Sequence, residues 1–94
     1  GKNNLTSLPE AISNLTNLGV LNLANNELTS IPEGISNLTN LTWLYLSSNN
    51  LTTLPEGISN LTNLKELNLF NNKLISNSEK ARIRKLLPNT DITY

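Results

Sequence analysis

The chain has 94 residues, a formal net charge of zero and an apolar content of 37%, of which little is aromatic. A neutral chain has little long-range attraction for nucleic-acid phosphates or anionic lipid, so we expect no nucleic-acid partner. No apolar run approaches the ~18 residues that a membrane span requires. The chain contains no Cys and no His, which excludes disulfides and removes the commonest metal ligands and general bases. We therefore expect one domain without a cofactor.

The dominant feature is an internal repeat with a period of 23 residues. Three segments align without gaps, at residues 5–27, 28–50 and 51–73, and the remaining residues 74–94 are predicted to form a C-terminal cap. Proline and asparagine recur in phase with the leucines. The leucines that mark the period, and are expected to turn inward, are Leu5, Leu28, Leu51 and Leu74.

Each repeat contains two different periodicities. Apolar and polar residues alternate at residues 21–23, 44–46 and 67–69, which predicts a strand in each repeat. Residues 32–38 place apolar side chains three apart, which predicts a short helical or 3-10 turn. Successive right-handed coils of this kind place their strands in one parallel sheet. The inward apolar side chains of one coil are predicted to be Leu18, Leu21, Leu23, Leu28, Ile31, Ile35 and Leu38.

A single coil cannot fold alone. Burying about seven apolar side chains yields roughly 10–20 kcal/mol. Ordering the backbone costs about 1–2 kcal/mol per residue, which is more over the whole coil. Neighbouring coils must therefore share burial and hydrogen bonds.

An asparagine follows each predicted strand, where the chain turns towards the interior. A buried Asn must satisfy both its carbonyl and its amide, and stacked Asn side chains achieve this by bonding the turns of their own and the next coil. We interpret these residues as an internal ladder, with a binding or deamidation site as the alternative. They are Asn3, Asn26, Asn49 and Asn72.

The C-terminal segment has the features of a cap. Ser76 and Glu79 have the spacing of a capping box, and residues 79–87 read as an amphipathic helix that Pro88 ends. Residues 91–94 alternate and predict a last edge strand. The helix carries four bases, which we interpret as the solvated face of the cap, with a nucleic-acid or lipid patch as the alternative. The bases are Lys80, Arg82, Arg84 and Lys85; the apolar face comprises Ile83, Leu86 and Leu87.

The N-terminal end shows no comparable cover. The strand around Leu21 is expected to be a bare sheet edge, and such edges invite pairing with another chain. The sequence therefore predicts self-association through this end. The side chains expected to face it are Leu5, Leu8, Ile12 and Leu15.

Two further patterns follow the repeat. A glutamate occupies the same position of each repeat, as Glu10, Glu33 and Glu56. Such a column of carboxylates suits a cation site or acid–base catalysis. Each glutamate also follows a proline at the start of a helical arc, where negative charge is favoured. Asn-Leu-Thr matches a glycosylation acceptor, and its central Leu is a core position in every case. We interpret both patterns as products of the repeat.

The frame L-x-x-L-x-L-x-x-N-x-L occurs at residues 18–28, 41–51 and 64–74. It resembles the leucine-rich repeat family in its 23-residue form. The resemblance implies an α/β solenoid, a right-handed superhelix with a concave parallel sheet, convex short helical or 3-10 arcs and a C-terminal capping helix. It also implies a protein partner, bound on the concave sheet. The Asn-rich style is similar to bacterial members, many of them exported, so we expect a secreted or bacterial cell-surface location rather than a cytoplasmic one, with a host or cell-surface protein as one kind of partner.

Alternation places the neighbours of the inward leucines on the concave face. Three of the chain's four aromatic residues fall there, and exposed aromatics often mark binding sites. The alternative is that these aromatic residues are merely scattered on the surface and bind no partner. The predicted partner-binding residues are Val20, Asn22, Trp43, Tyr45, Ser47, Glu66, Asn68 and Phe70, with Ala24 beside them. The flanking candidates are Asn25, Ser48, Lys65 and Asn71.

We therefore predict a non-enzymatic module that binds a partner protein on its concave sheet. One alternative is a structural or targeting segment of a larger protein. Another is a carbohydrate or lipid binder that uses Trp43 and Tyr45 as a platform. We expect no catalytic residue, because the Ser residues lack a base to activate them.

Overall fold

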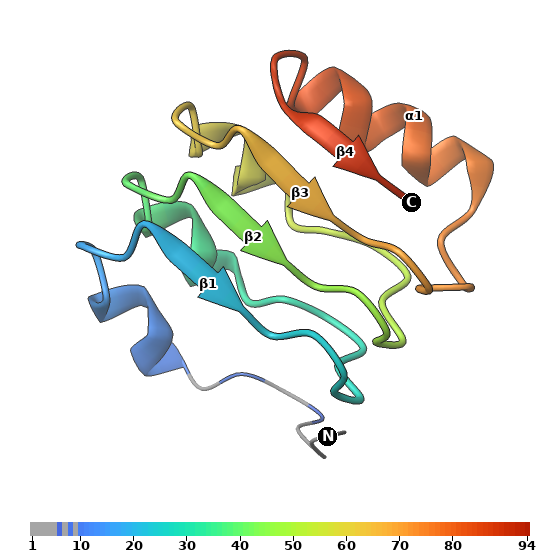
Figure 1. Ribbon diagram of the computed structural model, residues 1–94, viewed down its shortest axis with the longest axis horizontal. Helices are drawn as coiled ribbons and strands as arrows, with labels where there is room; N and C mark the ends of the chain where they lie inside the picture. The colour runs from blue at the N-terminus through green and yellow to red at the C-terminus, as the bar shows by residue number, and fades with distance from the viewer. Residues whose placement is uncertain (1–5, 7, 9) are drawn as a thin grey trace.

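The computed structural model describes residues 6, 8 and 10–94, and it forms a short α/β solenoid (Figure 1). Strands alternate with 3-10 helices, labelled η, until a single α-helix and a last strand close the chain. In chain order the elements are η1 (Glu10–Asn14), β1 (Val20–Asn22), η2 (Glu33–Asn37), β2 (Trp43–Tyr45), η3 (Glu56–Asn60), β3 (Glu66–Asn68), α1 (Asn77–Leu86) and β4 (Asp91–Thr93).

The strands form one parallel sheet in the order β1-β2-β3-β4. Val20 pairs with Trp43 and Trp43 with Glu66, so partners are 23 residues apart, as the repeat predicts. The last step is longer, because Glu66 pairs with Asp91. Each regular strand begins one residue before the predicted alternation.

Main-chain hydrogen bonds extend the ladder beyond the three-residue strands. The Leu23 amide donates to the Tyr45 carbonyl at 2.8 Å, and the Leu46 amide donates to the Asn68 carbonyl at 2.8 Å. The predicted strand segments therefore lie within the ladder even where they leave regular strand geometry.

The convex side is built from the 3-10 helices, which lie behind the sheet in Figure 1. Pro32 and Pro55 precede η2 and η3 with φ of −67° and −65°, a torsion that the proline ring imposes. Glu33 and Glu56 then occupy the first helical position and are exposed, as expected for acids at the positive end of the helix dipole. The side chain of Glu10 lies outside the described part of the chain.

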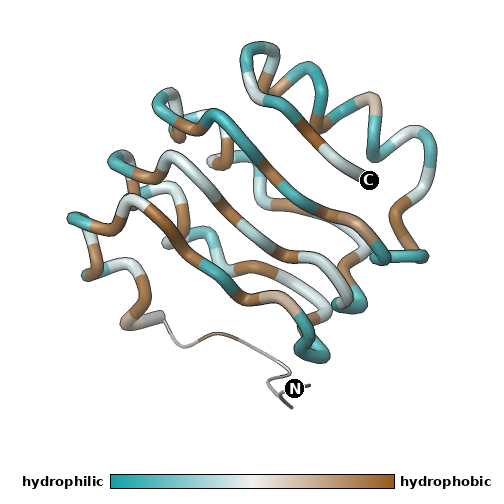
Figure 2. The backbone as a smooth tube through the Cα atoms, viewed as in Figure 1, coloured by the Kyte–Doolittle hydropathy of each residue, from teal (hydrophilic) through white to brown (hydrophobic). Residues whose placement is uncertain are grey.

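Leucine and isoleucine side chains from successive coils fill the interior, and Figure 2 shows apolar residues recurring at corresponding places in each coil. In the first coil Leu18 and Leu23 are only partly buried, whereas their equivalents Leu41 and Leu46 are fully buried. The difference arises because β1 is the outermost strand of the sheet, while β2 has a neighbour on both sides.

Leu74 departs from the repeat. Leu28 and Leu51 are fully buried, but Leu74 is 64% exposed and Ile75 is buried instead. After Asn72 the chain leaves the repeat towards α1, and the Ile75 amide donates to the Asn72 carbonyl at 3.3 Å, which tightens the turn. The prediction that Leu74 turns inward is therefore wrong, because this turn moves the inward position on by one residue.

A ladder of buried asparagines joins the coils. The Asn49 amide nitrogen donates to the Leu46 carbonyl of its own coil and to the Leu23 carbonyl of the preceding coil, both at 3.0 Å. Its carbonyl oxygen accepts the Leu28 amide at 3.0 Å. Asn72 repeats this pattern one coil later, at 2.9 to 3.0 Å. Among the described residues no buried side-chain polar atom lacks a partner.

The ladder prediction is therefore confirmed where the structure describes it. Asn26 is buried and donates to the Leu23 carbonyl at 2.9 Å. Asn3 and Leu5 lie outside the described residues.

The α-helix begins earlier than predicted. Ser76 is its N-cap and accepts the Glu79 amide at 3.1 Å, so the helix starts at Asn77 rather than at Glu79. The Glu79 carboxylate turns away from the cap and accepts hydrogen bonds from the Thr53 hydroxyl at 2.8 Å and the Leu54 amide at 3.2 Å. Instead of closing a capping box, Glu79 fastens the helix to the third coil.

Three of the four bases on α1 make contacts within the protein. Arg82 pairs with Glu79 at 2.8 Å and Arg84 donates to the Thr90 carbonyl at 2.9 Å. Lys80 lies 5.2 Å from the centre of the Tyr94 ring, whose hydroxyl donates to the Lys80 carbonyl at 3.1 Å. Burial raises the pKa of the Tyr94 phenol, while Arg84 opposes that shift and Glu79 adds to it. These contacts favour the cap interpretation over a free basic patch.

The closing strand β4 follows the helix as predicted, and Ile92 packs against the core. None of the helices in the described part of the chain is long and apolar enough to cross a membrane.

We expect Asn49→Ala to lower the free energy of unfolding by several kcal/mol. The change leaves the buried Leu28 amide without a partner, which costs about 1–3 kcal/mol. It also removes one of the two asparagine hydrogen bonds that the Leu23 and Leu46 carbonyls each accept, at about 0.5–1.5 kcal/mol per bond. The matched control is Asn50→Ala, at an exposed neighbour, expected to change stability by less than about 0.5 kcal/mol. Urea unfolding of both variants measures the difference, and equal midpoints would show that the ladder does not hold the coils together.

Candidate binding surface

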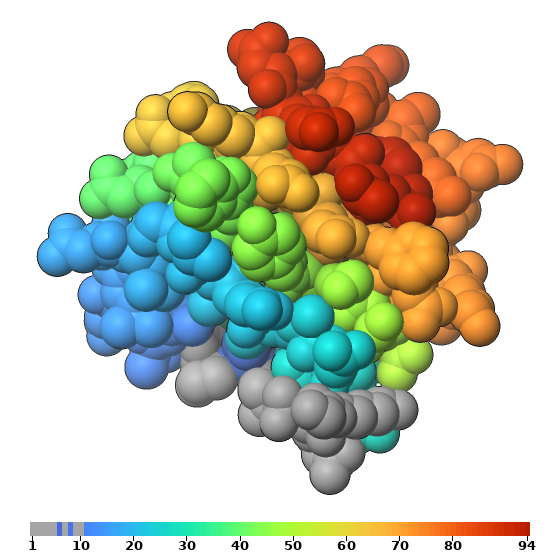
Figure 3. Space-filling model, viewed as in Figure 1, coloured from blue at the N-terminus to red at the C-terminus, as the bar shows by residue number. Residues whose placement is uncertain are grey.

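The sheet presents its outward side chains in three columns that cross the strands. Each strand buries its central residue, Leu21, Leu44 or Leu67, so the residues on either side of it face away from the core. The bands of colour in Figure 3 show the successive coils lying side by side across this face. The first column is Val20, Trp43, Glu66 and Asp91; the second is Asn22, Tyr45, Asn68 and Thr93; the third, just past the strands, is Ala24, Ser47 and Phe70.

Aromatic and aliphatic side chains form a diagonal band over the first three strands. Val20 is 44% exposed, Trp43 42% and Phe70 59%, while Tyr45 is half-buried. Trp43 pairs with Val20, and Tyr45 lies two residues further along β2 and so on the same face. Phe70 lies two residues beyond Asn68, the partner of Tyr45. We name Val20, Trp43, Tyr45 and Phe70 the apolar band.

Two asparagines flank Tyr45 in the second column. The Asn22 carbonyl oxygen accepts the Ala24 amide at 3.0 Å, and the Asn68 carbonyl oxygen accepts the Phe70 amide at 2.9 Å. These bonds orient both side chains and bend the chain out of the strand, because a side-chain oxygen replaces a main-chain partner. Among the residues that the structure describes, none accepts a hydrogen bond from their amide nitrogens.

Two carboxylates stand together at the other end of the first column. Glu66 and Asp91 are register partners on β3 and β4, whose strand axes lie about 4.8 Å apart. Glu66 is half-buried and Asp91 exposed. The one ion pair among the described residues joins Arg82 to Glu79 on α1, so neither carboxylate has a counterion there. We name Glu66 and Asp91 the acidic pair.

The sequence reasoning placed Glu66 on this face but missed Asp91 and Thr93. The alternation of residues 91–93 carried the signal, since Ile92 turns inward and its neighbours must turn outward. The same alternation that predicts the strand therefore also places Asp91 and Thr93 on the outward face. The face therefore extends over four strands rather than three.

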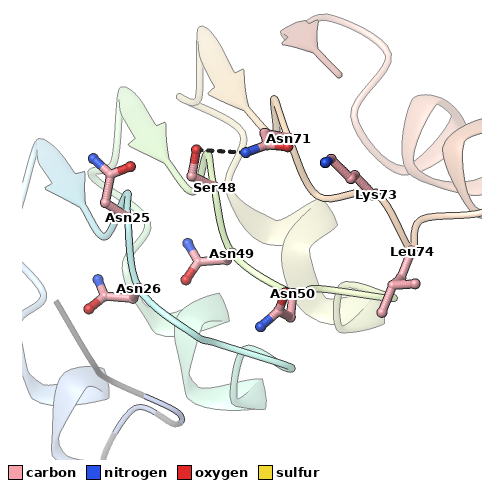
Figure 4. Close-up of a pocket in the computed structure, with 8 residues that line it drawn as sticks. All are labelled: Asn25, Asn26, Ser48, Asn49, Asn50, Asn71, Lys73 and Leu74. Carbon is pink, nitrogen blue, oxygen red and sulfur yellow. Dashed lines mark hydrogen bonds between the residues drawn. The ribbon is translucent and has the colours of Figure 1, made fainter. Parts of the chain in front are cut away.

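The flanking candidates divide between the two ends of the strands. Asn25, Ser48 and Asn71 follow the strands in left-handed backbone conformations, with φ of 62°, 57° and 63°. They form a row in a trough of about 550 Å³, where the Asn71 amide donates to the Ser48 hydroxyl at 3.2 Å (Figure 4). Lys65 precedes β3 and is exposed at the opposite end. The row and Lys65 therefore flank the concave face at opposite ends of its strands.

The chemistry of the face suits noncovalent recognition. It combines exposed aromatic rings, oriented amides and carboxylates on a sheet whose interior is closely held by leucines. Within the described residues, no three His, Cys, Asp or Glu side chains gather in a group that could hold a metal ion.

Comparison with known proteins gives concordant results. A family model described as a leucine-rich repeat region matches residues 1–88. A leucine-rich repeat protein of Leptospira interrogans has a solved structure that superposes with a TM-score of 0.92 at 48% sequence identity. The match covers 95% of this chain and 22% of that protein, so the chain spans about a fifth of its length. A search of curated proteins gave no match.

The 23-residue register, the parallel sheet backed by 3-10 arcs and the family match over residues 1–88 together show that this chain belongs to the leucine-rich repeat family.

Proposed function

We propose that the chain is a protein-interaction module that binds its partner on the concave sheet, through the apolar band and the columns around it. Leucine-rich repeat proteins generally serve as interaction modules, and solenoids of this kind use their concave surfaces for binding. The observation that carries the proposal is the exposure of Trp43 and Phe70 beside Tyr45 on one sheet face.

Physical reasons support this choice of face. Trp and Tyr are among the residues that contribute most to protein interfaces, because they bury large areas with few torsions to fix. The strands beneath are held by in-register main-chain bonds, so the rings lose little backbone freedom when a partner binds. The partner-binding set proposed from the structure is Val20, Asn22, Trp43, Tyr45, Ser47, Glu66, Asn68 and Phe70, extended by Asp91 and Thr93.

Trp43 is the chain's single tryptophan, and it supplies a built-in probe of this face. We expect a partner captured on the immobilised chain to move the Trp43 emission to shorter wavelength, because binding removes water from the ring. We expect the double variant Trp43→Ala, Tyr45→Ala to bind at least about 30-fold more weakly, because the loss of one hot-spot side chain costs about 2 kcal/mol. This variant lacks the fluorescent ring, so its affinity is measured by titration calorimetry. Both side chains lie outside the core, so the urea midpoint should change little.

The matched control is Leu74→Ala, which shortens an even more exposed apolar side chain away from the concave columns. It is expected to leave affinity unchanged. An affinity that the double variant preserves in a folded protein would remove this face from consideration and favour a structural or targeting role. A glycan array that yields a Trp43-dependent ligand would favour a carbohydrate binder instead.

We also propose self-association through the β1 end of the sheet. β1 is an edge strand, with no strand on its outer side among the described residues, and Leu15 near it is 47% exposed. Unpaired strand edges beside apolar side chains favour pairing between chains.

Light scattering across a concentration series tests this proposal. The apparent mass should rise with protein concentration, and Leu15→Lys should return it towards that of a monomer, because charge at an edge opposes pairing. Thr52→Lys, at an exposed position on a later coil, is the control and should leave association unchanged. A strict monomer at high concentration contradicts the proposal.

A further inference from the structure

The concave face changes from apolar to acidic along its first column, a feature that membership of the leucine-rich repeat family does not imply. Its first column runs from Val20 and Trp43 to Glu66 and Asp91, so an indole ring stands directly beside a carboxylate. Adjacent strands are about 4.8 Å apart, which places the acidic pair within one to two strand spacings of Trp43. Apolar and acidic groups are therefore within reach of one side chain of a partner.

Charge on this face is of one sign. The three columns contain Glu66 and Asp91 but no Lys or Arg. Lys65 precedes Glu66 in the chain, yet no ion pair joins it to either carboxylate. A partner that covers the face must match these two negative charges with positive ones, because burying an unpaired charge is costly.

The acidic pair does not help the fold. Like charges on paired positions of neighbouring strands repel each other. The inward residues Leu67 and Ile92 supply the packing of β3 and β4. Two facing carboxylates without a counterion are therefore a local cost to stability that a bound cation would remove.

We propose that the concave face recognises an extended protein segment that carries an arginine, an inference that rests on the proposed function. The arginine contacts Trp43 and the acidic pair. An apolar side chain of the same segment contacts the apolar band. A guanidinium fits this corner better than an ammonium does. It bonds a carboxylate with two parallel N–H donors and stacks its plane on an aromatic ring. Glu66 and Trp43 are register partners, so one guanidinium can contact both.

The length of the face fixes the spacing of the partner's side chains. Phe70 lies four residues beyond Glu66, which corresponds to about 13 Å along an extended chain. An extended segment that runs along β3 has residues i, i+2 and i+4 on one side. The arginine and the apolar side chain are therefore expected two to four residues apart.

Selection from a random dodecapeptide library displayed on phage, against the intact chain, tests the inference. Enriched peptides should carry an arginine with an apolar residue two to four positions away. Synthetic copies are then titrated by Trp43 fluorescence. We expect the Glu66→Gln, Asp91→Asn double variant to weaken binding at least about tenfold, and replacement of the peptide arginine by lysine to weaken it severalfold.

The controls separate charge from folding. Glu33→Gln neutralises an exposed carboxylate on η2, away from the sheet, and should leave affinity unchanged. The double variant removes a like-charge pair, so its urea midpoint should be no lower than that of the original chain.

The outcomes distinguish the two proposals. Peptides that need Trp43 and Tyr45 but show no arginine, or that bind the double variant equally well, would overturn this inference and leave the interaction module intact. Binding that is lost on addition of a chelator would also overturn it, by identifying a cation as the occupant of the acidic pair. A library that yields no peptide dependent on Trp43 would count against both proposals.

Discussion

The structure depends on the asparagine ladder that joins each coil to the next. One Asn49 side chain accepts from the Leu28 amide and donates to carbonyls of its own coil and the coil before. The polar groups of the turn are thereby satisfied inside the protein, where water cannot reach them. Because Asn72 repeats the pattern one coil later, the coils stack in a fixed register. That register places Val20, Trp43 and Glu66 side by side.

Most of the fold could be predicted from the sequence because one local solution is repeated. Alternation about Leu21, Leu44 and Leu67 indicates strands, because successive side chains of a strand point to opposite faces. The proline before each helical arc fixes the backbone torsion with which the arc begins. Prediction failed where the repeat ends. Leu74 continues the leucine rhythm in the sequence, yet the turn towards α1 buries Ile75 in its place. The apolar side chain of Leu74 favours burial, but the direction of the chain towards α1 leaves it exposed. A local sequence pattern does not predict that direction.

The cap shows the same limit. The capping serine was recognisable, but the carboxylate expected to complete a capping box turns to Thr53 and Leu54 in the third coil. A local motif and a tertiary contact competed for one side chain. The contact fastens the helix to the stack, and a sequence does not show which segment lies opposite Glu79.

The position of the candidate surface could be predicted from the sequence, but its extent could not. Alternation places Trp43, Tyr45 and Phe70 outward, and all three lie outside the core. The pairing of Asp91 with Glu66 breaks the 23-residue step, because α1 intervenes between β3 and β4. Only the three-dimensional register brings the two carboxylates together.

The outward columns differ from coil to coil while the inward positions are nearly constant. Leu21, Leu44 and Leu67 are the same residue, whereas their outward neighbours in the first column are valine, tryptophan and glutamate. The core constrains only the inward positions, because a side chain that points to water makes few packing contacts and its substitution changes stability little. A sheet of this kind separates the residues that hold it together from the residues that can recognise a partner. The acidic pair illustrates the separation, because a charge repulsion that a compact core would not tolerate costs little at the edge of an open sheet face. Residues on this open face can therefore determine which partner is bound, with little effect on the stability of the fold.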